Sequence, residues 1–354
     1  MNFENLPDNW KVVRLGRVAE ISPAKYSEYY GSEILFIPME LIPQGEKAIV
    51  DFEVRSRDEV KSGIPVYPND LLIAKITPCF ENGKIGFVPN KSGYFIATTE
   101  VYPIRPKGKI DMKFLFYFLK LSEIREHLKN QMTGTSGRKR VPKGALLSLP
   151  IPLPPLPEQK RIVEILSLAE DLIKKQKEAI ALIDKILMAK FLEMFGDPAT
   201  NPKGWEVRRL DEVILNMRHG ISRKGIKKSL KNPLKCLRPS NINKQCKVNL
   251  SDVRIVKFSE RDFNRAGLTK GELVISHLNG SIDHVGKCIL FVFEDKWIFD
   301  SNLLAIKLNP QKIDSYYSYW VWRYLFIQEK FKEIAVKTTG GQYLLGTVKI
   351  TKNK

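Results

Sequence analysis

Short apolar runs, each bounded by Gly, Pro, Asn or Asp, recur through both halves of the chain. Runs of this length with turn-forming residues at their ends are typical of β-strands in a packed sheet. In the first half the predicted strands cover residues 33–38, 70–76, 84–89 and 94–104. In the second half they cover residues 273–278, 287–293 and 303–308. The pattern therefore predicts two sheet-rich regions.

A helix-like segment and a polar loop follow the strands in each half. The aromatic-rich segments Met112–Asn130 and Ser315–Val336 each predict one helix packed on the sheet. Their aromatic side chains recur at helical spacing, which favours core packing over stacking on nucleic acid bases. A Gly- and Thr-rich loop closes each half, "TGTSGRKR" in the first and "KTTGGQ" in the second. The fold class predicted from these elements is mixed α/β, mostly sheet with a packed helix.

The two halves resemble one another at a nearly constant offset. "WKVVRLGRV" from Trp10 matches "WEVRRLDEV" from Trp205, an offset of 195. "KIDMKFLFYFL" from Lys109 matches "KIDSYYSYWVW" from Lys312, an offset of 203. The offset grows in one direction, as expected for two copies with a few insertions, and it is far longer than the period of a solenoid repeat. We therefore predict two copies of one domain, residues 1–150 and residues 201–354.

Residues 151–200 match neither copy. Five prolines fall between Pro150 and Pro157, and a heptad-like apolar pattern then runs to Phe195. The start at Pro157 and the end at "FGDP" suit a helix, and ~1.5 Å per residue gives it a length of roughly 57 Å. A single long helix with an apolar stripe needs a partner helix. The predicted interface residues are Ile162, Ile165, Ala169, Leu172, Ile173, Ala179, Ile180, Ile183, Ile186 and Leu187.

The formal net charge of +19 lies on the two copies. Residues 1–150 carry 22 Lys and Arg against 17 Asp and Glu, and residues 201–354 carry 29 against 14, whereas residues 151–200 carry 7 against 8. Two basic regions on either side of a neutral segment indicate a polyanion, such as nucleic acid, bound at two places. Four cysteines without C-x-x-C spacing suit the cytoplasm, and neither a signal peptide nor a membrane partner is expected.

The motifs that catalysis would require are missing. The sequence has neither the Asn/Asp-Pro-Pro-aromatic motif of an adenine methyltransferase nor the phosphate-binding loop of a translocating ATPase. A zinc site built from Cys236, Cys246, His284 and Cys288 would need an unusually wide gap between its first two ligands. We therefore expect a non-catalytic protein with no cofactor and no metal.

The run "LPPLPEQKRIVEIL", the long helix to "FGDP" and the new opening "GWEVRRLDEV" resemble the specificity subunit of a Type I restriction–modification system. The resemblance covers essentially the whole chain. It implies two target recognition domains, each reading one half of a bipartite site in double-stranded DNA. It also implies a spacer, residues 151–200, that docks methyltransferase subunits and, through them, the restriction and translocase subunit. Because a duplex turn is about 34 Å, the helix length would set the separation of the half-sites.

One departure from the family changes the expected partners. At the offset of 204 that relates Thr135 to Thr339, Lys354 stands opposite Pro150, so we expect the second spacer helix of the family to be absent. The apolar stripe would then be covered by another copy of the chain, by a second partial specificity subunit or by the methyltransferase. The alternatives are a truncated or silent specificity protein, and a coiled-coil adaptor that binds nucleic acid without sequence preference.

Candidate DNA contacts lie in loops that combine basic or amide side chains with Gly and Thr. Phosphates are bound by Lys and Arg, and base edges are read by Arg, Asn and Gln. In the first copy the candidates are Lys75, Thr77, Asn82, Lys84, Thr135, Ser136, Arg138, Lys139 and Arg140. In the second copy they are Arg218, His219, Ser222, Arg223, Lys224, His277, Asn279, Lys337, Thr338, Thr339 and Gln342. For each residue the alternative is a solvated loop position.

Overall fold

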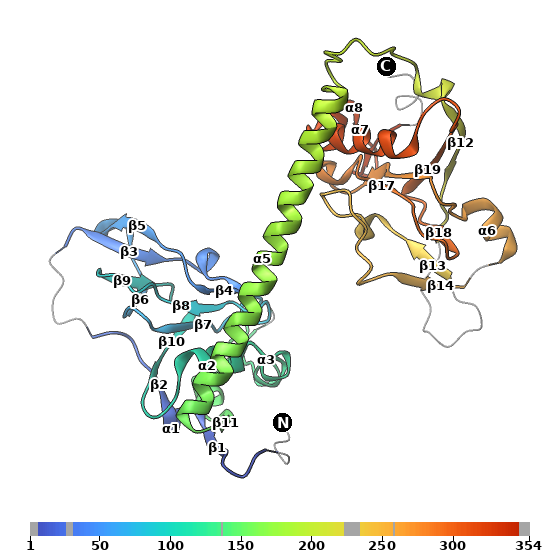
Figure 1. The fold of residues 1–354 in the computed structure, drawn as a ribbon. Coiled ribbons are helices and arrows are strands. Elements are labelled where there is room, and N and C mark those ends of the chain that lie inside the picture. Colours follow the sequence, from blue (N-terminus) through green and yellow to red (C-terminus); the bar gives the residue numbers. More distant parts are fainter. Residues whose placement is uncertain (1–5, 26–30, 136, 223–233, 258, 347–354) are drawn as a thin grey trace. The chain divides into compact units, whose positions relative to one another are not determined.

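The structure is a computed structural model, and it describes residues 6–25, 31–135, 137–222, 234–257 and 259–346. Two compact units, Met1–Lys177 (unit 1) and Glu178–Lys354 (unit 2), divide the chain within one long helix, α5 (Leu156–Phe195). Figure 1 shows this helix in green, continuous from unit 1 into unit 2. Each unit therefore contains its own sheets and one part of α5.

Two larger sheets hold most of the described strands of unit 1. The first has the order β2–β10–β7–β8–β4, with strands Ala19–Ile21, Val101–Pro106, Leu71–Ala74, Ile85–Phe87 and Gln44–Ile49. The second has the order β5–β3–β9–β6, with strands Glu53–Ser56, Glu33–Ile37, Phe95–Ala97 and Ile64–Val66. Strand β10 is antiparallel to both of its neighbours, whereas β3 and β9 are parallel. The chain thus passes repeatedly between the sheets.

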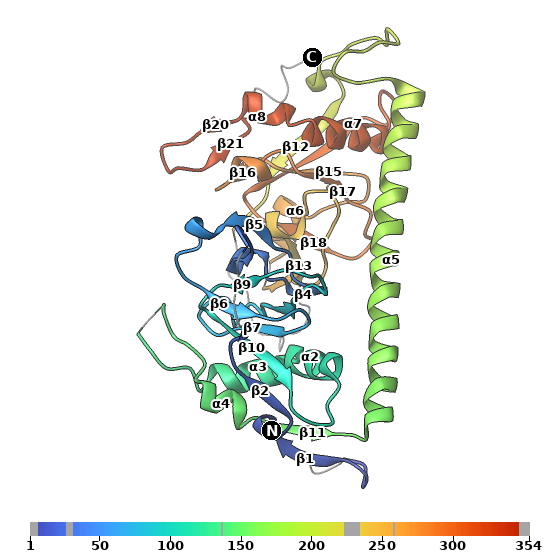
Figure 2. The same ribbon diagram turned by 90° about the vertical axis from the view of Figure 1, so that its left-hand side faces the viewer.

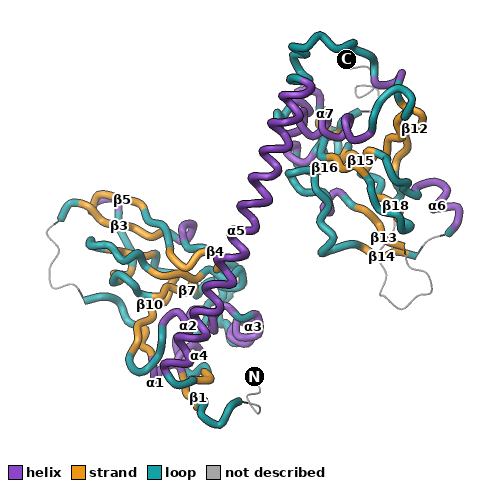
Figure 3. Tube along the Cα trace, viewed as in Figure 1, coloured by secondary structure: helices purple, strands orange, loops and turns teal. Residues whose placement is uncertain are grey.

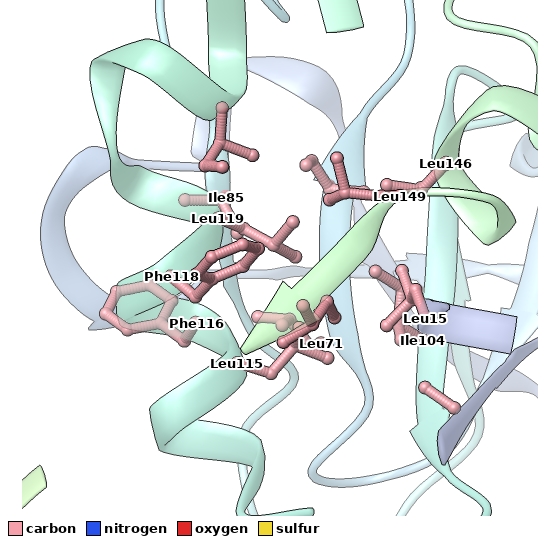
Figure 4. Packing of buried hydrophobic residues seen from close by; sticks show 14 of the residues in the cluster. Leu15, Leu71, Ile85, Ile104, Leu115, Phe116, Phe118, Leu119, Leu146 and Leu149 are labelled. Atoms are coloured by element: carbon pink, nitrogen blue, oxygen red, sulfur yellow. The ribbon is translucent and has the colours of Figure 1, made fainter. Parts of the chain in front are cut away.

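The helices of unit 1 pack on the first sheet. They are α1 (Leu15–Val18), α2 (Met112–Lys120), α3 (Ser122–Lys129) and α4 (Lys143–Leu147). The single helix predicted from Met112 to Asn130 is therefore two helices, because the backbone of Leu121 is extended (ψ 134°) and ends α2. Figure 4 shows Leu115, Phe116, Phe118 and Leu119 of α2 packed in the core with Leu71 and Ile104. The aromatic side chains fill this core, as their spacing predicted.

The proline-rich run is a β-strand. Strand β11 (Pro150–Leu153) pairs antiparallel with β1 (Lys11–Arg14), and Val13 lies opposite Ile151. Proline has no amide hydrogen, but Pro150 and Pro152 alternate with residues that keep theirs, so one edge of the strand can still pair. The chain therefore enters α5 from a strand that is fixed to unit 1.

The described strands of unit 2 form three sheets. Figure 3 draws the strands of both units in orange. The largest has the order β12–β19–β15–β17, with strands Ile214–His219, Leu303–Leu308, Leu273–Ser276 and Cys288–Leu290. The second is β14–β13–β18, with strands Arg254–Val256, Leu234–Leu237 and Trp297–Phe299. The smallest is β16–β21–β20, with strands Leu278–Asn279, Tyr343–Leu344 and Val336–Lys337. The helices are α6 (Glu260–Ala266), α7 (Ser315–Ile327) and α8 (Lys330–Ile334).

The two units share one topology. The order β2–β10–β7–β8 in unit 1 corresponds to β12–β19–β15–β17 in unit 2, and the parallel pair β3–β9 corresponds to β13–β18. The registers agree as well, because Ala74 lies opposite Val101 and Ser276 lies opposite Leu303, an offset of 202 for both residues. The predicted fold class, mixed α/β with two repeated sheet-rich domains and a long helix between them, is confirmed.

Helix α5 has 40 residues, which corresponds to about 60 Å. It ends at Phe195, and the positive φ of 80° at the next residue, Gly196, favours glycine. The Lys203 ammonium donates hydrogen bonds to the carbonyls of Glu193 and Met194 in the last turn. Of the ten predicted interface residues, only Ile162 packs against the core of unit 1. The other nine are exposed, with Ile165 at 59% and Ile183 at 56%.

Candidate nucleic-acid interface

In unit 1 the structure brings the two candidate loops together. We call residues 75–84 and 133–141 loop pair 1. An antiparallel bridge joins Ile76 to Arg140, and a second bridge joins Arg140 to Thr133. Further backbone hydrogen bonds run from Thr77 N to Lys139 O (2.9 Å) and from Val141 N to Lys75 O (2.8 Å). Figure 2 shows the segment between α3 and α4, which contains the second loop, projecting from unit 1.

Several cationic side chains of loop pair 1 have partners within the unit. The Arg140 guanidinium binds both carboxylate oxygens of Glu100, at 2.9 and 2.7 Å, and this pairing lowers the pKa of Glu100. The Lys75 ammonium lies 5.2 Å from the centre of the Tyr102 ring, and burial lowers the pKa of Lys75. Lys84 donates to the carbonyl of Met39 at 2.6 Å. These three side chains hold the loops in place.

Other candidates in loop pair 1 reach solvent. Asn82, Thr135, Arg138 and Lys139 are exposed. Gly134 has φ 124°, and a Cβ at this position would lie 2.9 Å from the carbonyl of Arg138. Only glycine fits there, so the turn that presents Arg138 depends on it. Ser136 lies outside the described residues.

Unit 2 repeats the arrangement. We call residues 277–287 and 336–345 loop pair 2. The small sheet β16–β21–β20 joins these loops, and Leu278 pairs with Leu344 as Ile76 pairs with Arg140. Leu345 N donates to His277 O at 2.8 Å, which corresponds to the bond from Val141 to Lys75 in unit 1. The two loop pairs are therefore equivalent in position and differ in their side chains.

The β20–β21 hairpin carries the exposed candidates of loop pair 2. Lys337, Thr339 and Gln342 are exposed, and Thr338 closes the turn by accepting from Gln342 N and donating to Gln342 O (3.2 and 3.0 Å). Figure 2 shows this hairpin projecting from unit 2. At the offset of 204, Gln342 takes the position of Arg138. The equivalent loops thus present a guanidinium in one unit and an amide in the other.

His277, the first residue of loop pair 2, is buried. It is 6% exposed, and burial lowers its pKa. Its Nε2 is 3.3 Å from Nδ1 of the exposed His219 and 3.2 Å from the carbonyl of Ser301. His277 therefore anchors the start of the loop in the interior, while His219 is exposed and Asn279 is half-buried.

Arg218 belongs to a buried ion pair. Its guanidinium binds both oxygens of Glu272, at 2.6 and 2.8 Å, and the Glu272 side chain is 2% exposed. In unit 1, Asp70 stands at the position equivalent to Glu272. It also forms a bidentate ion pair, with Arg105, at 2.6 and 2.9 Å. The carboxylates thus stand at equivalent positions, whereas the arginine comes from β12 in unit 2 and from β10 in unit 1. Ser222 is exposed, and Arg223 and Lys224 lie outside the described residues.

The sequence did not reveal which residues join each unit to α5. Gln159 is fully buried and binds the backbone of unit 1, and Glu170 binds the Lys120 ammonium at 2.6 Å. In unit 2 Asp184 binds Arg323 and, at 3.0 Å, Lys247. One signal was present in the sequence, since Lys120 and Arg323 are related by the offset of 203.

Neither a metal centre nor a membrane span is found in the described part of the chain. Its residues include no group of three or more His, Cys, Asp and Glu placed to hold a metal ion. Within the same residues no helix combines the length and the apolar character needed to cross a bilayer. All four cysteines are free thiols, and Cys246 accepts a hydrogen bond from the amide of Cys288 at 3.5 Å.

Residues 7–182 match the family model of the Type I restriction modification DNA specificity domain. The chain therefore belongs to the Type I restriction–modification specificity family, as the resemblance predicted.

Particular relatives include the Type I restriction enzyme EcoAI specificity subunit of Escherichia coli, 40% identical over 174 residues, with 47% of this chain and 30% of the relative covered. The EcoEI specificity subunit of E. coli is 35% identical, with 45% of this chain and 27% of the relative covered. The chain thus spans less than a third of both relatives. The EcoKI specificity subunit of E. coli K12 is 24% identical, with 97% of this chain and 77% of the relative covered.

Solved structures share the fold. The specificity subunit of M. genitalium matches with a TM-score of 0.52 at 15% identity, covering 99% of this chain and 85% of that one. A chain from a structure of a type I restriction–modification complex matches with a TM-score of 0.52 at 18% identity, covering 98% of this chain and 85% of that chain. At these identities the likeness concerns the fold alone.

Proposed function

We propose that this protein is the DNA-recognition subunit of a Type I restriction–modification complex, with residues 1–150 and 201–354 as its two target recognition domains. Each domain reads one half of a bipartite double-stranded site, without catalysing a reaction. The observation that carries the proposal is the repetition of the loop pair, because two equivalent surfaces with different side chains suit two different half-sites. The net charge of +19 supports a polyanionic ligand.

The spacer, residues 151–200, has a second role in the proposal. Nine predicted interface residues of α5 are exposed, and an apolar stripe of this kind is typical of a helix that packs against partners. We propose methyltransferase subunits as these partners, with the restriction and translocase subunit joining through them. A second copy of the chain or a partial specificity subunit is the alternative occupant. In the same proposal the helix sets the separation of the half-sites.

Mapping of methylated bases tests the DNA-recognition role. The chain would be expressed with its methyltransferase subunits in a host without other methylation, and modified adenines would be mapped across the genome. The expected result is one bipartite sequence with a fixed number of unread base pairs, lost when the chain is omitted. Salt-sensitive binding to DNA without enrichment of any bipartite site would contradict the proposal and favour a nonspecific coiled-coil adaptor.

A further inference from the structure

Unit 2 contains an open cavity that includes part of loop pair 2. Its volume is about 480 Å³, within the ~300–1,000 Å³ that is usual for ligand sites. The lining comes from two segments of unit 2, residues 239–244 after β13 and residues 279–287 from β16 to β17. The lining residues are Pro239, Ser240, Ile242, Asn243, Lys244, Asn279, His284 and Lys287.

Lys287 brings a buried cation to this cavity. The residue is only 4% exposed, and its ammonium donates to the carbonyls of Pro239 at 2.9 Å and Ile242 at 2.5 Å. Burial lowers the pKa of Lys287, and the neighbouring Lys244 also acts to lower it, against the opposing effect of Cys246. The two carbonyls orient the ammonium but carry no full charge, so its positive charge is not neutralised.

Two further groups in the lining carry or can gain a positive charge. Lys244 is exposed, and among the described residues it has neither a hydrogen-bond partner nor an ion-pair partner. Burial lowers the pKa of His284, and so do Lys287 and Lys244. The adjacent Asp283 opposes these effects, but its carboxylate also binds Lys332 Nζ at 2.7 Å. An anion in the cavity would therefore relieve a repulsion among three nearby groups.

The two asparagines of the lining add hydrogen-bond donors. Oδ1 of Asn243 accepts from the amides of Gln245 and Lys247, at 3.0 and 2.9 Å. Oδ1 of Asn279 accepts from the amide of Ser281 at 3.2 Å. Each acceptor is thus used within a turn, whereas neither Nδ2 group has a partner among the described residues. Cations together with free N–H donors match the oxygens of a phosphate group.

Unit 1 keeps the buried lysine at the equivalent place. Lys84 donates to the carbonyl of Met39 at 2.6 Å, as Lys287 donates to that of Pro239. Met39 and Pro239 each begin a 3₁₀ turn, so the two turns are equivalent at an offset of 200. The lysine and its bond to the turn therefore belong to the shared fold.

The rest of the lining differs in charge between the units. Ser240, Asn243, Lys244 and His284 stand where unit 1 has Glu40, Pro43, Gln44 and Glu81, at offsets of 200 for the first three and 203 for the last. Two carboxylates thus take the places of a hydroxyl and an imidazole, and one cation is missing. At this place unit 1 repels an anion and unit 2 attracts one.

We propose that the cavity of unit 2 binds a phosphate group of the DNA backbone, and that unit 1 has no such site. The proposal rests on the proposed function and adds an asymmetry between the two recognition domains. Contacts to phosphates fix the position of a protein on a duplex without reading its sequence. The cavity would therefore anchor unit 2 beside its half-site, while the β20–β21 hairpin remains available for reading bases.

Replacement of single phosphates by neutral methylphosphonates tests the anchor. The full chain, assembled with its methyltransferase subunits, would bind duplexes with one such replacement in or beside the half-site of unit 2. At the anchored position the replacement should weaken wild-type binding roughly 10-fold. In Lys244→Glu the same replacement should no longer weaken binding, because a neutral group does not repel the introduced carboxylate. Absence of any position that behaves in this way would overturn the proposal.

Two further variants make the test specific. Ser240→Glu introduces the side chain that unit 1 has at this place, and it should abolish the same sensitivity. Lys257→Glu makes the charge change of Lys244→Glu at an exposed position of unit 2 outside the cavity, and it should keep the full 10-fold effect. Equal behaviour of the two lysine variants would reveal a general effect of charge and would also overturn the proposal. A wild-type complex without preference for a bipartite site would instead contradict the proposed function.

Inorganic phosphate carries the same chemistry, so a titration at constant ionic strength distinguishes the two sources. The ring signals of His284 in the full chain would be followed by NMR and assigned with His284→Gln. Inorganic phosphate should shift these signals, and a duplex with the bipartite site should displace it. Phosphate that stays bound in the presence of this duplex would overturn the DNA backbone as the occupant. Signals that respond to neither ligand would overturn the site itself.

Discussion

Arg138 and Gln342 occupy equivalent positions in the two loop pairs, and both side chains are exposed. Arginine commonly binds guanine in the major groove, whereas glutamine commonly binds adenine. If the loop pairs read bases, this exchange of one side chain would let the same loop geometry serve two different half-sites. The turn geometry is separately fixed by Gly134 in unit 1 and by Thr338 in unit 2.

Replacement of Arg138 tests the reading role of loop pair 1. Arg138→Ala should relax the preference at one position of the first half-site, at a cost of ~1–3 kcal/mol for the preferred base, and leave the second half-site unchanged. Competition binding with duplexes that vary one base at a time measures this. Lys113→Ala, which removes a charge from an exposed position of α2, is the control. An equal loss for all sequences would identify Arg138 as a phosphate contact.

Two histidines of unit 2 predict a pH dependence of stability. Burial lowers the pKa of both His277 and His284, so their folded forms resist protonation more than the unfolded chain does. Stability is then fully present above the unfolded histidine pKa of ~6.5 and falls as the pH drops below it. Urea unfolding between about pH 7.5 and pH 5 should show this fall, and His277→Gln with His284→Gln should reduce it. An unchanged pH profile in the double variant would contradict the prediction.

At the scale of elements, Gln159 links α5 to unit 1. Its side chain accepts from the amide of Asp111, which caps α2, at 2.8 Å and donates to the carbonyls of Lys109 and Pro154, at 3.2 and 2.8 Å. These backbone groups come from the start of α2 and from the segment before α5. One fully buried amide therefore satisfies three backbone groups where the two helices begin.

Gln159→Leu should destabilise unit 1 by roughly 3 kcal/mol, because it leaves buried backbone groups without partners at ~1–3 kcal/mol each. Gln176→Leu is the matched control, since Gln176 is exposed on the same helix and its replacement should change stability by less than ~0.5 kcal/mol. Urea denaturation of the full chain measures both effects. Equal stabilities of the two variants would show that the buried bonds contribute little.

The apolar patterns of the sequence were enough to predict the most buried strands, such as β3, β7 and β15, together with the repeat and α5, because burial on one face imposes a period on each element. Other strands, such as β5, β14 and β18, were not predicted. The patterns were not enough to divide residues 112–130 into α2 and α3, since no Gly or Pro marks the break at Leu121. The single helix predicted over residues 315–336 is likewise two helices, α7 and α8. Charge patterns also left open which cations bind within the protein. Arg218 and Lys84 resemble Arg138 in the sequence, and only the fold places Glu272 and the Met39 carbonyl beside them.

At the scale of the molecule, the exposed face of α5 is the main surface proposed to meet protein partners. Ile180 and Ile183 are 51% and 56% exposed, so their replacement should not disturb either unit. Ile180→Lys with Ile183→Lys should abolish co-purification with methyltransferase subunits and leave the melting temperature nearly unchanged. Lys177→Ala is a control at an exposed position nearby. Normal assembly of the doubly substituted protein would exclude this part of α5 as the docking face.

The pairing of β1 with β11 also bears on how the protein is made. A strand near the start of the chain, Lys11–Arg14, finds its partner only at Pro150–Leu153. During synthesis at ~5–20 residues per second, β1 must wait several seconds until most of unit 1 has left the ribosome. Contacts between residues so distant in sequence form slowly. Unit 1 should therefore complete its fold late in synthesis. The strand that completes it is β11, which leads directly into α5.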